Sequence, residues 1–144
     1  MAQPRIPPDP ARARLAEHVA EVPEVRFALL FGSRVTGVAR PDSDWDLGVY
    51  LADDLDAVER AAVRDRLVAA IEPRDPVDVV ILNEAPPLLA HRALLGEKLV
   101  ARDEVAFVRF AVRTLAAAGD EVYWRELHAR ERRSRLEQER FGRP

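Results

Sequence analysis

Three apolar runs of strand length constrain the fold of this chain more than any other feature. They stand at 25–32 (VRFALLFG), 44–51 (DWDLGVYL) and 77–82 (VDVVIL). Runs of this length between turn-forming residues are typical of strands in a buried sheet. At 55–71, between the second and third runs, the apolar spacing changes to that of a helix. This order predicts an α+β domain with a small mixed sheet flanked by helices.

Helix start and stop signals predict the elements around these runs. Asp9 followed by Pro10 is a typical helix start, and Gly96 is a typical helix stop. Asp103 stands before an apolar helical segment, and Gly119 separates that segment from a very polar one. The predicted elements are helices at 10–22, 86–95, 103–118 and from 119 onward, and a short strand at 98–102.

The length and composition limit the domain organisation. With 144 residues the chain can build one hydrophobic core. We predict a disordered, proline-rich lead-in at 1–8, one domain at 9–118 and a polar C-terminal helix at 119–144. The last segment is typical either of a solvated helix or of an arm that docks a partner.

Charge and cysteine content exclude several function classes. A net charge of −3 and a pI near 5.7 give no bulk attraction to nucleic acid or to an anionic membrane, and leave open only a local basic groove. The chain has no cysteine, so it forms no disulfide and no thiolate zinc site. No apolar run approaches the roughly 20 residues of a membrane span, and the N-terminus has no signal-peptide core. We therefore expect a cytoplasmic protein.

Aspartates interrupt two of the apolar runs. Because side chains alternate along a strand, Asp44 and Asp46 are predicted to share one face while Trp45 and Leu47 point to the other. Asp78 interrupts the third run, and an adjacent strand would bring it beside the pair. Three neighbouring carboxylates repel one another unless a cation lies between them, and oxygen ligands of this kind suit Mg²⁺.

Gly32 and Ser33 stand where the first strand ends and a helical turn is predicted. Glycine allows a ligand to approach the backbone closely, and a serine hydroxyl adds a hydrogen-bond donor for phosphate. Taken singly, a Gly-Ser turn or one aspartate is most often structural. The combination of phosphate-binding and metal-binding features predicts metal-assisted phosphoryl or nucleotidyl transfer.

The motif as a whole resembles a known family. Gly32-Ser33, ten intervening residues, Asp44-x-Asp46 and the later Asp78 are similar to the signature of the DNA polymerase β-like nucleotidyltransferase superfamily. The stretch GSRVTGVARPDSDWDLGVYL resembles its minimal nucleotidyltransferase (MNT) group, and LLGEKLVARDE with the later RF resembles the MntA-type antitoxins of HEPT/MNT toxin–antitoxin systems. The specific part of this resemblance spans roughly residues 31–78.

The resemblance implies a role for each motif residue. Gly32 and Ser33 would bind the triphosphate of ATP, and Arg34 either steadies a phosphate or is a solvated or salt-bridged residue. The catalytic carboxylates Asp44 and Asp46 would hold two Mg²⁺ ions. Asp78 would complete one metal site and help to deprotonate the attacking hydroxyl.

The resemblance also implies a partner. A HEPT toxin would receive AMP on a tyrosine hydroxyl and form a hetero-oligomer with this chain, which favours the docking arm for the C-terminal segment. Two alternatives stay open: an antitoxin that acts only by steric binding, and a nucleotidyltransferase that acts on a small molecule. The three intact carboxylates favour a catalytic antitoxin over a purely steric one. The absence of an obvious second substrate domain counts against a small-molecule substrate.

Overall fold

A computed structural model describes residues 9–36 and 43–141, with no account of the side chains at 36, 121–123 and 139–141. The predicted lead-in at 1–8 and most of the loop before the second strand lie outside these residues. Four strands form one mixed sheet in the order β3-β2-β1-β4, in which β2 and β3 are parallel and the other pairs are antiparallel. The strands are β1 (Val25–Phe31), β2 (Trp45–Leu51), β3 (Val77–Ile81) and β4 (Glu97–Ala101).

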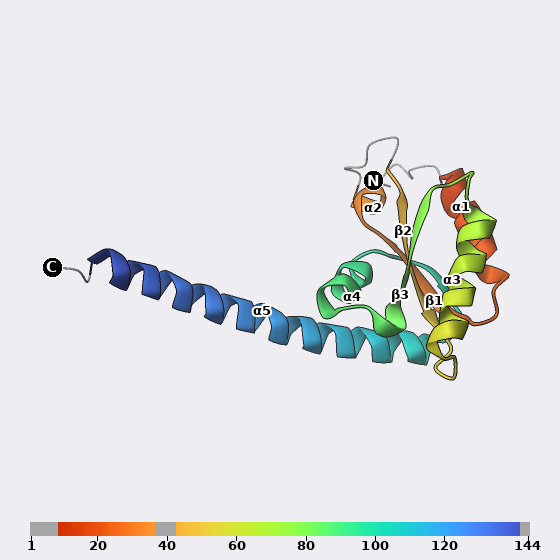
Figure 1. Ribbon diagram of the computed structural model, residues 1–144. Coiled ribbons are helices and arrows are strands. Elements are labelled where there is room, and N and C mark those ends of the chain that lie inside the picture. The colour runs from red at the N-terminus through yellow and green to blue at the C-terminus, as the bar shows by residue number, and fades with distance from the viewer. Residues whose placement is uncertain (1–8, 37–42, 142–144) are drawn as a thin grey trace, which may run out of the picture.

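Helices cover both faces of the sheet (Figure 1). One face packs against α1 (Pro10–Ala20) and α3 (Ala57–Ile71), whose buried side chains include Leu15, Leu67 and Ile71. The other face packs against α4 (Pro87–Leu94) and the first part of α5 (Glu104–Phe141). Short helical turns follow β1 as α2 (Ser33–Thr36) and β3 as η1 (Leu82–Glu84). The predicted α+β class and the fourth strand are confirmed.

Local sequence explains where the helices begin. The Asp9 side chain accepts a hydrogen bond from the Ala11 backbone N–H at 2.9 Å, so it caps α1 as predicted. Asp103 caps α5 in the same way, because its carboxylate accepts from the Ala106 N–H at 3.0 Å. The predicted break at Gly119 is wrong, since α5 is one helix of 38 residues that passes through it. The predicted domain boundary at residue 118 therefore falls inside a continuous helix, which extends far beyond the sheet in Figure 1.

An ion pair with a buried carboxylate ties α1 to the turn that precedes β3. Asp75 is only 6% exposed, and it accepts hydrogen bonds from Arg14 Nε at 2.9 Å and Nη2 at 2.7 Å. The hydrogen bonds from Arg14 hold the pKa of Asp75 below its ordinary value. A lowered folded-state pKa means that the pair contributes stability above the unfolded-state pKa and that this contribution is lost as the pH falls.

We expect Asp75→Asn to lower the melting temperature by several degrees at pH 7, because it removes the buried carboxylate that accepts both hydrogen bonds from the half-buried Arg14 guanidinium. The difference between wild type and variant should shrink as the pH falls below the ordinary aspartate value of 3.8. Thermal melts between pH 3 and pH 7, followed by circular dichroism, measure both effects. Asp65→Asn, on the exposed side of α3, is the matched control. A difference that grows in acid would contradict this account.

Candidate active site

The start of β2 places a carboxylate beside a second one on β3. Asp46 and Asp78 are register partners in the parallel pair β2–β3, so their side chains leave the same face of the sheet. Trp45 and Leu47 are buried in the opposite face against α1 and α3. The predicted alternation along this strand is confirmed for Asp46. Asp44 lies one residue before β2 begins and is exposed.

The pKa of Asp46 responds to burial and to the other two predicted acids. Asp46 is half-buried, and burial together with the charges of Asp78 and Asp44 raises its pKa, while Arg92 opposes the rise. Residues 9–36 and 43–141 contain no group of three His, Cys, Asp or Glu side chains arranged to hold a metal ion. Mg²⁺ needs only one or two protein carboxylates when substrate phosphates complete its shell. The Asp46–Asp78 pair, with Asp44 nearby, therefore has the chemistry that this ion requires.

Gly32 closes the site on the β1 side. It follows β1 directly, has a φ of +82°, and is the only described residue with a positive φ. A Cβ placed on it would lie 2.0 Å from Asp46 Oδ2. Only glycine permits both this backbone conformation and this contact. Position 32 therefore requires glycine because of its positive φ and because of the Asp46 carboxylate on the neighbouring strand.

A cavity of about 310 Å³ lies beside this contact. It joins the end of β1 and the turn α2 to the C-terminal end of α4. Its lining residues are Phe31, Gly32, Ser33, Val35, Arg92, Leu95 and Gly96. The predicted phosphate-binding pair Gly32-Ser33 therefore faces a space that is open to a ligand.

Two lining residues were not predicted as site residues from the sequence. Arg92 brings a positive charge to the cavity and acts on Asp46. Gly96 lies so close to β1 that a Cβ on it would stand 2.0 Å from the Leu30 carbonyl oxygen. The only sequence signal was the predicted helix stop at Gly96, which says nothing about the strand beside it.

Arg34 contacts the segment that leads into β2. Its Nε donates to the Ser43 carbonyl at 2.7 Å, and its guanidinium lies 4.9 Å from the Trp45 ring centroid. Arg34 does not line the cavity, whereas Arg92 does. These contacts connect α2 to the start of β2 and so brace the segment that precedes Asp46.

Comparisons with known proteins identify similar sequences and structures. Residues 14–105 match the family described as "Polymerase beta, Nucleotidyltransferase". The chain is 30% identical over 95 residues to the protein adenylyltransferase MntA of Shewanella oneidensis strain MR-1, covering 66% of this chain and 67% of that protein.

Solved structures show the same architecture. One, described as a toxin–antitoxin with AMP-PNP, has a TM-score of 0.58 and 26% identity and covers 88% of this chain and 96% of that one. A second, of a tri-AMPylated Shewanella oneidensis HEPN toxin in complex with an MNT antitoxin, has a TM-score of 0.53 over 89% of this chain and 94% of that one. At 24% identity the second supports the fold alone. From the family match over residues 14–105 and the similarity to MntA, the chain belongs to the polymerase β nucleotidyltransferase family.

Proposed function

We propose that this chain is an antitoxin that transfers AMP from ATP to a tyrosine hydroxyl of a cognate HEPT-type toxin and thereby neutralises it. The observation that carries the proposal is the contact of Gly32 with Asp46, next to a cavity that also contains Ser33 and Arg92. A cavity of about 310 Å³ next to the Asp46 carboxylate supports a site for the phosphates of a nucleotide. MntA is named as a protein adenylyltransferase, and a similar solved structure is a toxin–antitoxin with AMP-PNP, which support the nucleotide and the partner.

The proposed reaction is an in-line attack on the α-phosphorus of ATP. A bond forms between the acceptor oxygen and the α-phosphorus, the bond to the pyrophosphate oxygen breaks, and pyrophosphate leaves. Gly32 lets the triphosphate approach the backbone, and the Ser33 hydroxyl donates to a phosphate oxygen. Asp78, which is exposed beside Asp46, accepts the proton of the attacking hydroxyl.

Asp44, Asp46 and Asp78 are the residues that would hold Mg²⁺. When bound, the ion would supply charge neutralisation for the phosphate oxygens of the substrate. The raised pKa of Asp46 is consistent with this role, because carboxylates that lie close together to bind a cation repel one another in its absence.

Among the described residues, no helix combines the length and the apolar character of a membrane span. A cytoplasmic location stays a prediction.

The test uses the full chain and its cognate HEPT-type toxin, each purified separately. With Mg²⁺ and ATP labelled on the α-phosphate, we expect label on the toxin and a mass increase by whole AMP units on a tyrosine-containing peptide. ATP labelled on the γ-phosphate is the control and should leave the toxin unlabelled. Label that passes only from the γ-phosphate would make the chain a kinase and contradict the proposal.

A further inference from the structure

Helix α5 carries two different apolar faces. Phe110, Thr114 and Ala118 are buried at spacings of four residues, and Phe110 packs in the core against the sheet. A second row points away from that core, although its members are all apolar. This row is Val105, Val108, Val112 and Leu115, which are 60%, 55%, 63% and 55% exposed.

The spacing of this row along α5 is typical of residues through which one helix packs against another. The intervals of three, four and three residues are those of a and d positions in a heptad. Four large apolar side chains more than half exposed on one stripe are unusual for a surface that stays in water. The stripe therefore has the pattern of one half of a helix–helix contact.

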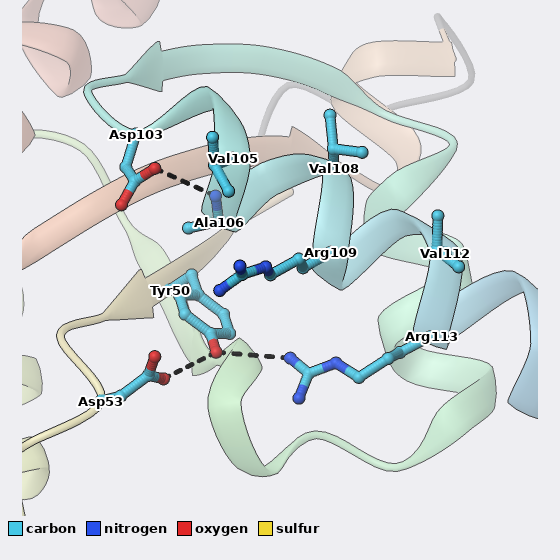
Figure 2. A pocket seen from close by; sticks show the side chains of 9 residues that line it. All are labelled: Tyr50, Asp53, Asp103, Val105, Ala106, Val108, Arg109, Val112 and Arg113. Atoms are coloured by element: carbon cyan, nitrogen blue, oxygen red, sulfur yellow. Dashed lines mark hydrogen bonds between the residues drawn. The ribbon is translucent and has the colours of Figure 1, made fainter.

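A groove lies along the first part of this stripe (Figure 2). It has a volume of about 630 Å³ and runs between α5 and the end of β2, with Tyr50 and Asp53 on one side and Arg109 and Arg113 on the other. Phe27 stacks on Tyr50 with the ring centroids 5.0 Å apart and so supports the Tyr50 side of the groove. The groove is larger than the cavity beside Asp46.

The charged side chains of the groove differ in how far their hydrogen-bonding groups are already used within the chain. Asp53 accepts a hydrogen bond from the Tyr50 hydroxyl at 2.8 Å, and the Asp103 carboxylate is used as the cap of α5. Arg113 donates to the Tyr50 hydroxyl at 3.3 Å and keeps its other donors, and Arg109 extends over the groove toward Tyr50 (Figure 2). The two carboxylates and two guanidinium groups of the lining balance in formal charge, but the carboxylates already accept hydrogen bonds within the chain. The guanidinium donors beside the apolar side chains therefore suit a partner that brings carboxylates of its own.

The groove and the candidate active site share one face of the sheet. Tyr50 follows Asp46 by four residues on β2, so both side chains leave the same side of the strand. At about 3.3 Å per residue they are roughly 13 Å apart along the strand. A protein seated in the groove would hold its neighbouring segments within reach of the Asp46–Asp78 pair.

We infer that this groove docks an amphipathic helix of the cognate toxin, with apolar residues at heptad spacing and acidic residues opposite Arg109 and Arg113. The inference rests on the proposed function only for the identity of the partner. A second copy of this chain fits less well, because a symmetric antiparallel contact centred between Val108 and Val112 would bring Arg109 of each copy close to Arg113 of the other.

The test is the double variant Val108→Glu/Val112→Glu in the full chain, which places two carboxylates in the apolar stripe. We expect its affinity for the toxin, measured by calorimetry, to fall at least 100-fold, while binding of AMP-PNP stays within twofold. Val58→Glu is the matched control, because Val58 is 78% exposed on α3 and lies on the opposite side of the sheet. Unchanged toxin affinity of the double variant would overturn the inference.

Charge reversal gives an independent test that leaves the apolar stripe intact. Arg109→Glu should weaken toxin binding at least tenfold and make the remaining affinity less sensitive to salt. Light scattering of the antitoxin alone checks the other occupant: a dimer that Val108→Glu/Val112→Glu dissociates would assign the groove to a second copy and overturn the inference. Because binding is measured without ATP, loss of docking is distinguishable from failure of AMP transfer, which would remove the proposed reaction and leave this interface.

Discussion

We expect Asp46→Asn to lower the rate of the proposed AMP transfer to the toxin by about 10³-fold or more, and this variant tests the carboxylate pair most directly. The variant removes one charge from the pair that would hold Mg²⁺, and metal stabilisation of the transferring phosphate contributes several kcal/mol, at 1.36 kcal/mol for each tenfold change in rate. Single-turnover assays with α-labelled ATP and purified toxin measure the loss. The substitution lies away from the groove on α5, so toxin binding should be unchanged.

The stability of Asp46→Asn separates a catalytic defect from misfolding. The folded-state pKa of Asp46 is raised by burial and by its acidic neighbours, so the ionised form destabilises the ligand-free protein. A raised pKa means that stability is highest below the unfolded-state value and is lost as the pH rises. The variant should therefore melt a few degrees above wild type at pH 7, and the gain should disappear in acid.

Growth assays decide between chemistry and steric cover. Asp44→Asn/Asp46→Asn should bind the toxin yet fail to rescue cells that express it, and the toxin should carry no added AMP. Full rescue by this variant with an unmodified toxin would instead support an antitoxin that acts by contact alone. Asp65→Asn, an exposed aspartate on α3, controls for the loss of a negative charge.

The second large effect is expected from Gly32→Ala. The alanine would have to adopt a φ of +82°, and its Cβ would meet Asp46 Oδ2 at 2.0 Å, so the carboxylate must move. Displacement of a reacting group by about 1 Å can cost roughly 10²-fold in rate, and we expect at least that loss in AMP transfer. Assays of AMP transfer and AMP-PNP binding measure the effect.

Gly119→Ala is the matched control for this prediction. Gly119 lies inside α5, and a Cβ there meets no atom within 4 Å. Alanine in a helix interior should stabilise the protein by about 0.5–1 kcal/mol without changing activity. Normal transfer by Gly32→Ala would show that the close approach to Asp46 has no part in the reaction.

The sheet could be predicted from the sequence because its signals are local. Apolar runs and the alternation of Asp46 between Trp45 and Leu47 define which face each side chain takes. The β2–β3 register, which makes Asp46 and Asp78 partners, depends on how α3 returns the chain and is not contained in either strand. Arg92 and Gly96 were missed for the same reason, because their role comes from the packing of α4 beside β1.

Helix α5 shows where local signals mislead. Glycine inside a helix costs roughly 1 kcal/mol, which predicted a break at Gly119. The residues before it are three alanines, the strongest helix formers, so the helix propagates through the glycine. The sequence also showed apolar residues on nearly every side of this helix. Only the structure separates the buried row from the exposed one, because burial depends on the single face that the sheet covers.

The exposed row of α5 and the candidate active site differ in how many substitutions the folded protein can tolerate. Gly32 is confined by the carboxylate of Asp46, and almost any replacement would collide with it. Val105, Val108 and Val112 are already largely in water, so their replacement costs the folded state little. The residues of the exposed stripe can therefore change while the residues of the candidate active site stay the same. If the stripe docks the toxin, a few substitutions on this one helix could therefore stop two related proteins in one cell from binding each other's toxins.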